Sequence, residues 1–131
     1  MTLKTDGLHH LALRVTDRAR AKQFYTEALG FPIVMESHEV LIVNANGVFI
    51  GIRAGAPETE HGDRFNPYRV GLDHLALAVP NAVALEDVKR QLDAAGVSNN
   101  GIEDDAVLGG RYISFCDPDG IAWELYASAG Q

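Results

Sequence analysis

The sequence contains a single cysteine, Cys116, which excludes an intramolecular disulfide and a zinc site built from several thiolates. It also lacks any run of the about 20 apolar residues that a membrane-spanning helix needs. Its first residues show no apolar stretch typical of a signal peptide. Lys and Arg number only 11 against 18 Asp and Glu, and the net charge of −7 argues against non-specific nucleic-acid binding. We therefore expect a cytoplasmic protein with neither nucleic acid nor membrane as a partner.

The most informative feature is a nine-residue segment that occurs twice. Residues 7–15 read GLHHLALRV and residues 71–79 read GLDHLALAV, so the copies differ only at their third and eighth positions. Apolar residues alternate with small or polar ones, as in a strand with one apolar face. His10 and His74 hold equivalent positions on the less apolar face.

Each copy begins the same predicted order of elements: strand, helix, then three strands. In the first half, the predicted elements are a strand at 8–15, a helix at 18–29 capped by Thr16-Asp17 and ended by Gly30, and strands at 33–36, 40–43 and 48–52, with an Asn46-Gly47 turn. In the second half, they are a strand at 72–79, a helix from a cap at Asn81 to Gly96, a weak strand at 97–102, and strands at 111–116 and 121–126 around the turn at 117–120.

Neither half could bury both faces of its sheet alone, so we expect the halves to share one domain. The predicted fold class is α+β, with two tandem βαβββ modules of mixed sheet. Module one covers residues 7–53, a Gly- and Pro-containing linker covers 54–70, and module two covers 71–127.

Aligning the last hairpins of the two halves places Gly51 opposite Glu124. A carboxylate in an apolar strand is costly to bury unless it is paired or bound to a cation. Two neutral imidazoles and one carboxylate leave open positions on a divalent ion. The hypothesis is that His10, His74 and Glu124 bind one metal. The alternative is that both histidines are hydrogen-bonded structural residues and that Glu124 pairs with an arginine.

Other candidates have two interpretations each. Tyr112 is a candidate proton donor or orienting residue, or a core residue. Arg14 shares the His10 face and is a candidate contact for an anionic substrate, or a surface ion pair. His9 is predicted to point to the opposite face as a structural or solvated residue, whereas His38 and His61 fall outside the repeat and fit surface positions.

The sequence resembles the vicinal oxygen chelate superfamily, which includes glyoxalase I, extradiol dioxygenases and the fosfomycin and bleomycin resistance proteins. The resemblance rests on HLALRV, HLALAV, FYTEALGF and DPDGIAWELY, and extends from Leu8 to Tyr126. It implies curved sheets that form a cup and a metal held by the positions of His10, His74 and Glu124. The family's fourth ligand position falls on Gly51, which argues against glyoxalase I activity.

The resemblance implies two hypotheses for function. The first is a metalloenzyme, dioxygenase-like or lyase/transferase-like, whose small-molecule substrate chelates the ion through oxygen. Fe(II) or Mn(II) is favoured, with Ni(II), Zn(II) or Co(II) as alternatives. The second is a metal-free binding or sequestration protein of the bleomycin-resistance type. A homodimer is expected in either case.

Overall fold

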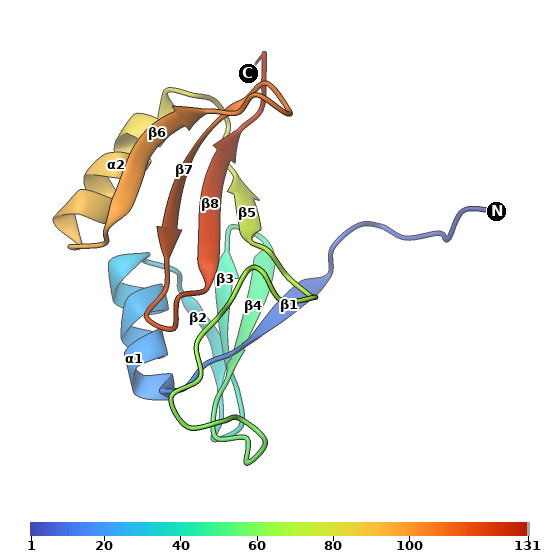
Figure 1. Cartoon of the computed structure of the whole chain (residues 1–131), viewed down its shortest axis with the longest axis vertical. Helices are drawn as coiled ribbons and strands as arrows, with labels where there is room; N and C mark the ends of the chain where they lie inside the picture. The colour runs from blue at the N-terminus through green and yellow to red at the C-terminus, as the bar shows by residue number, and fades with distance from the viewer. Residues whose placement is uncertain (131) are drawn as a thin grey trace. The chain divides into compact units, whose positions relative to one another are not determined.

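The computed structural model describes residues 1–130, which divide into two compact units, one of residues 1–61 and one from residue 62 onward. Each unit is a four-stranded mixed sheet with one helical segment beside it (Figure 1). The predicted α+β fold with a repeated βαβββ order is therefore confirmed. No helix within residues 1–130 combines the length and the apolar character needed to cross a bilayer.

The first unit has its strands in the order β1-β4-β3-β2. Strands β1 and β4 are parallel, and the other neighbours are antiparallel. Its elements are β1 (His10–Arg14), α1 (Arg18–Gln23), the π-helical turn η1 (Phe24–Ala28), β2 (Ile33–Glu36), β3 (Leu41–Ala45) and β4 (Val48–Arg53). The predicted turn joins β3 to β4, with positive φ at Asn46 (51°) and Gly47 (99°), as a tight hairpin turn requires.

The helix of the first unit begins where its cap predicts but changes type in its second half. The Asp17 side chain accepts a hydrogen bond of 3.1 Å from the Arg20 backbone N–H, as expected for an N-cap. Tyr25 is fully buried at 0% exposure. The prediction of one regular helix to residue 29 is wrong in type, because residues 24–28 form a π-helical turn before Gly30 ends it at φ 74°.

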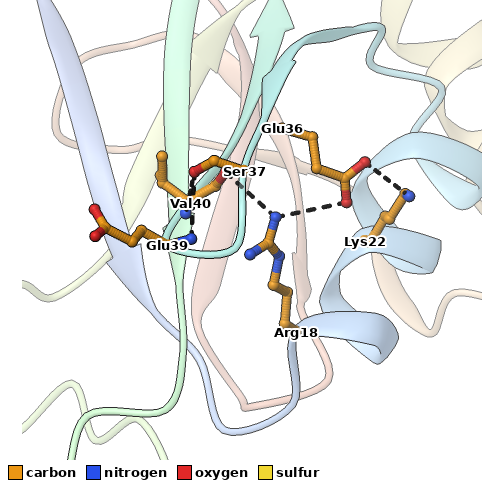
Figure 2. Close-up of polar contacts among 6 residues, drawn as sticks. All are labelled: Arg18, Lys22, Glu36, Ser37, Glu39 and Val40. Atoms are coloured by element: carbon orange, nitrogen blue, oxygen red, sulfur yellow. Dashed lines mark hydrogen bonds and ion pairs between the residues drawn. The ribbon is translucent and has the colours of Figure 1, made fainter.

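An ion-pair cluster connects α1 to the hairpin of β2 and β3 (Figure 2). The carboxylate of Glu36 lies between two cations, with Arg18 Nη2 at 3.5 Å and Lys22 Nζ at 3.0 Å. Arg18 also donates to the Val40 carbonyl at 3.3 Å. Because these side chains are partly exposed, each pair contributes at most about 1 kcal/mol, and the cluster mainly fixes the position of the hairpin.

The second unit repeats the topology, with strand order β5-β8-β7-β6 and a parallel β5–β8 pair. Its elements are β5 (Leu75–Ala78), α2 (Ala84–Ala94), β6 (Asn99–Asp104), β7 (Arg111–Cys116) and β8 (Ala122–Ala127). Several predicted bounds are wrong: β5 is shorter at both ends, so that His74 directly precedes it, β6 starts and ends two residues later than expected, and β8 one residue later.

The register of the two parallel pairs confirms the internal alignment. Ala12 on β1 pairs with Gly51 on β4. Ala76, the equivalent of Ala12 in the repeat, pairs with Glu124 on β8. Gly51 and Glu124 therefore occupy the same place in the two units, as the hairpin alignment predicts.

The predicted alternation also sets which face of each sheet is buried. Leu13 and Val15 are 6% and 1% exposed, whereas His10 and Ala12 are exposed. In the second unit Trp123, 1% exposed, precedes the less buried Glu124 on β8. The apolar faces thus form the cores, and the candidate ligands lie on the opposite faces.

A tyrosine network joins the end of β8 to the loop after β6. The Tyr126 hydroxyl donates to Asp105 Oδ2 at 2.6 Å and accepts from the Gly110 backbone N–H at 3.2 Å. The Tyr126 and Tyr112 rings stack with centroids 6.2 Å apart. This network fixes the loop of residues 105–110 against the sheet.

Replacing Tyr126 with phenylalanine is expected to raise the pKa of Asp105, because the Tyr126 hydroxyl is the main group that holds this pKa below its ordinary value, ahead of the Val107 backbone N–H. Carboxyl titration by NMR measures the change. A depressed carboxyl pKa stabilises the fold above the ordinary aspartate pKa, and this contribution is lost as pH falls through the folded-state pKa. The melting-temperature difference between the two proteins should therefore shrink on acidification, and a constant difference would contradict the assignment.

Candidate metal centre

His74 lies between two carboxylates in the second unit. Its Nδ1 is 2.6 Å from Asp73 Oδ1, and its Nε2 is 3.5 Å from Glu124 Oε1. The His74 side chain is 42% exposed and that of Glu124 is 19% exposed. The two predicted ligands of this unit are thus close together, on a face that a small molecule can reach.

Glu124 is held by strands on both sides and by the turn that precedes β8. It pairs with Ser114 of β7 on one side, and with Ala76 of β5 on the other. The buried Asp117 fixes the start of β8, since its Oδ1 accepts from the backbone N–H groups of Asp119 and Ile121 at 2.9 and 2.8 Å. Ligands on paired strands have restricted motion, which favours a defined geometry.

The pKa values of both His74 and Glu124 are raised, for different reasons. The pKa of His74 is raised, chiefly by its hydrogen bond to Asp73 and further by the charge of Glu124, while partial burial opposes the shift. The pKa of Glu124 is raised by its burial, and the neighbouring His74 opposes that shift. The carboxylate of Glu124 is therefore incompletely solvated, and a cation beside it would stabilise its charged form.

The chemistry and spacing of the pair fit a divalent metal. Ligand atoms about 2.1 Å from one ion lie roughly 3.0–3.4 Å apart for right-angle to tetrahedral arrangements. The 3.5 Å between His74 Nε2 and Glu124 Oε1 is close to this range. A carboxylate on the second ring nitrogen of a ligating histidine, as Asp73 provides, is also the usual arrangement at metal sites.

His10, the third predicted ligand, lies in the first unit at the start of β1 and is exposed. Its Nδ1 is 2.8 Å from the Nδ1 of His9, and the two rings meet edge to face with centroids 5.0 Å apart. The prediction that His9 points away from His10 is wrong, because His9 precedes the strand and strand alternation does not apply to it. That His10 binds the same ion as His74 and Glu124 stays a prediction.

The repeated sheet and the motifs on it correspond to one known superfamily. A family model for the Glyoxalase/Bleomycin resistance protein/Dioxygenase superfamily matches residues 7–125. The chain belongs to this superfamily. The predicted resemblance to vicinal oxygen chelate proteins is therefore confirmed.

Relatives within the Glyoxalase/Bleomycin resistance protein/Dioxygenase superfamily differ in what their names state. The chain is 30% identical to the uncharacterized protein YwkD of Bacillus subtilis over 96% of this chain and 98% of that one. It is 32% identical to the catechol-2,3-dioxygenase of the same organism over 81% of this chain but only 39% of the dioxygenase. The crystal structure of a glyoxalase family protein from Enterococcus faecalis matches with a TM-score of 0.78 at 27% identity, covering 92% of this chain and 97% of that one.

The remaining residues that the sequence singled out as site candidates lie in different environments. Tyr112 is half-buried on β7, and its pKa is raised, chiefly by a hydrogen bond to Glu103 and further by burial. Arg14 is exposed at the end of β1, where it pairs in register with Arg53 of β4, so two exposed arginines are neighbours on adjacent strands. His38 is exposed, with its Nε2 3.8 Å from Glu39 Oε1.

Sequence reasoning missed two residues at this site. Asp73 contacts His74 directly, and Asn100 donates to Ser114 Oγ at 3.2 Å, beside the position of Glu124. The sequence could have pointed to Asp73, because it occupies the third position of the repeat, where the two copies differ. In neither unit, over residues 1–130, do three His, Cys, Asp or Glu side chains gather in a metal-binding arrangement.

Proposed function

We propose that this chain is a divalent-metal-dependent enzyme of the superfamily that acts on a small molecule chelating through oxygen. The observation that carries the proposal is the His74–Glu124 pair, in which an imidazole nitrogen and a carboxylate oxygen lie 3.5 Å apart on an accessible face. His10, in the equivalent place of the other copy, would supply the third ligand. Two imidazoles and one carboxylate leave positions open for substrate oxygens.

The donor set favours Fe(II) or Mn(II), with Ni(II), Zn(II) or Co(II) as alternatives. When bound, such an ion supplies Lewis-acid stabilisation of a developing oxyanion, or a site for oxygen activation. The similarity to a catechol-2,3-dioxygenase supports ring-cleaving chemistry on a catechol-like substrate. A lyase or transferase reaction on another oxygen-chelating molecule is the alternative within the same proposal.

Other side chains of the chain would orient the substrate. The Asn100 side-chain amide donates a hydrogen bond to Ser114 Oγ. The hydroxyl hydrogen of Ser114 would then be available to a substrate oxygen beside Glu124. The Tyr112 hydroxyl donates to Glu103, and this hydrogen bond is the main reason that the pKa of Tyr112 is raised. Tyr112 would therefore orient the substrate, or act as a donor once its hydroxyl leaves Glu103, and Arg14 would contact an anionic group of the substrate.

A metal-free binding protein is the second candidate, and one observation favours it. His74 is flanked by Asp73 and Glu124, so an imidazolium there is compensated without any metal. This candidate predicts tight binding of a small molecule that EDTA leaves unchanged. We propose a homodimer for both functions.

Elemental analysis of protein purified without chelators or an affinity-tag metal tests the proposal. We expect about one equivalent of a transition metal in the wild type, and near none in His74→Ala. Iron would direct assays to catechols under oxygen, and the other ions to isomerase, lyase and thiol-transfer assays. Failure to bind any of the five ions after anaerobic reconstitution would refute the enzyme proposal and favour the binding protein.

A further inference from the structure

The third position of the repeat has a common role in the two units although its residue differs. It is His9 in the first copy and Asp73 in the second. In both units the side chain at this position contacts the same atom of the next residue: His9 Nδ1 is 2.8 Å from Nδ1 of His10, and Asp73 Oδ1 is 2.6 Å from Nδ1 of His74. Different residue types thus make the same contact with Nδ1 of the following histidine in both copies, which points to a common role.

We propose that Asp73 and His9 are positioning residues that determine which ring nitrogen His74 and His10 offer to the metal. The inference rests on the proposed function and goes beyond its ligand set. By engaging Nδ1, each partner leaves Nε2 as the coordinating atom. In the second unit this is the nitrogen that faces Glu124, at 3.5 Å.

The Asp73 contact selects one tautomer of a neutral imidazole. An ionised carboxylate only accepts hydrogen bonds, so the hydrogen of neutral His74 must lie on Nδ1 and the lone pair on Nε2. A 2.6 Å contact is at the short end for a charge-assisted hydrogen bond. Asp73 therefore orients the ring and also increases the basicity of the coordinating nitrogen.

The His9 contact is less selective. Two Nδ1 atoms that face each other share one hydrogen when both rings are neutral. If His10 donates it, the Nε2 of His10 is free to bind metal; if His9 donates it, Nε2 of His10 carries a hydrogen and cannot bind. The first unit thus offers a ligand that is competent in only one of two tautomers, and a neutral partner adds less basicity than a carboxylate.

Packing does not explain either residue. The Asp73 side chain is 77% exposed, and His9 belongs to an exposed stretch that precedes β1. A residue with so little burial contributes little to the core. Its defined contact is with the neighbouring histidine, as expected of a residue that acts through that histidine.

The test uses full-length protein and two readouts. The first is the dissociation constant for Zn(II), from competition with a chromophoric chelator. We expect Asp73→Ala to weaken binding by about 10–100-fold, the usual range for loss of an outer partner, and Asp73→Asn to weaken it less because the amide oxygen still accepts. His9→Asp should strengthen binding, since it gives His10 the partner that His74 has. Asp104→Asn, which removes an exposed carboxylate paired with Arg111, is the charge-matched control.

The second readout is the tautomer of His74 in metal-free protein, from the nitrogen shifts of the ring in alkaline buffer. We expect the Nδ1–H form in the wild type and in Asp104→Asn, and a shift toward the Nε2–H form in Asp73→Ala. A merely structural role for Asp73 would not change this ratio. The same tautomer in wild type and Asp73→Ala would overturn the inference.

The two proposals fail in different ways. If Asp73→Ala binds Zn(II) as tightly as wild type while His74→Ala loses it, the metal site stands and the orienting role is overturned. If His74→Ala itself keeps the wild-type affinity, the proposed metal site is wrong and the inference falls with it. Equal affinities of His9→Asp and wild type would overturn the part of the inference that concerns the first unit.

Discussion

Replacement of Glu124 by alanine is expected to lower the affinity for divalent metal by more than the about 10–100-fold typical of an outer partner. The carboxylate lies 3.5 Å from His74 Nε2, the nitrogen that we propose coordinates the metal. Its removal leaves one imidazole in the second unit to hold the ion. The measurement is metal stoichiometry after dialysis, together with a chelator competition titration.

The matched variants for this prediction are Glu124→Gln and Glu86→Ala. Glutamine keeps the size and an oxygen donor but loses the charge, so it should bind metal more weakly than wild type and more tightly than alanine. Glu86 is an exposed residue of α2, far from β8 in sequence. Its replacement should leave the affinity for metal unchanged. Wild-type affinity in Glu124→Ala would remove Glu124 from the ligand set.

Replacement of Gly110 by alanine is expected to destabilise the fold by about 1–3 kcal/mol, the usual cost of forcing an extra carbon into a packed site. A Cβ on Gly110 would clash with the backbone oxygen of Ala127 and lie 2.6 Å from Cε1 of Tyr126. The Ala127 oxygen belongs to β8 and cannot easily move. Relief of the clash requires the loop of residues 105–110 to separate from Tyr126, breaking the hydrogen bond from the Gly110 N–H. Chemical denaturation measures the loss.

Gly51→Ala is the control for this substitution. Gly51 is also a glycine of the sheet region without a positive φ, but the nearest atoms to its Cβ would be 3.7 Å away, an ordinary contact. Its replacement should change the free energy of unfolding by less than about 0.5 kcal/mol. Similar losses in both variants would show that steric crowding does not explain Gly110.

Side-chain periodicity predicted most of the elements because burial determines them. Strands β2 and β7 have the predicted bounds. The predicted hairpin turn forms at residues that tolerate positive φ, Asn46 and Gly47. The π-helical turn escaped prediction because it depends on backbone bonds, such as Leu29 N–H to the Phe24 carbonyl at 3.0 Å. A local widening of the helix leaves the apolar spacing almost unchanged. The start of β6 was misplaced because the strand is irregular between Asn99 and Ile102, where Gly101 adopts φ 75°.

The candidate site was predictable to the extent that it follows the repeat. The equivalence of His10 with His74, and of Gly51 with Glu124, follows from sequence offsets, and the second of these appears directly in the strand register. The contact of Asp73 with His74 was not predictable in this way. It joins adjacent residues just before a strand, where neither burial nor alternation restricts the side-chain rotamers.

The Gly51–Glu124 equivalence bears on how such a chain evolves. Duplication of one module supplies two copies of the same backbone frame, and only one copy needs to keep its carboxylate for a three-ligand centre. The other copy is then free to diverge. At Gly51 a Cβ would lie 3.7 Å from its nearest neighbours, an ordinary contact, so the strand can carry the first atom of a side chain at this position. Beside the proposed three-ligand centre, position 51 is thus the place in the first unit that corresponds to the carboxylate of the second unit and where divergence of the two copies has removed a side chain.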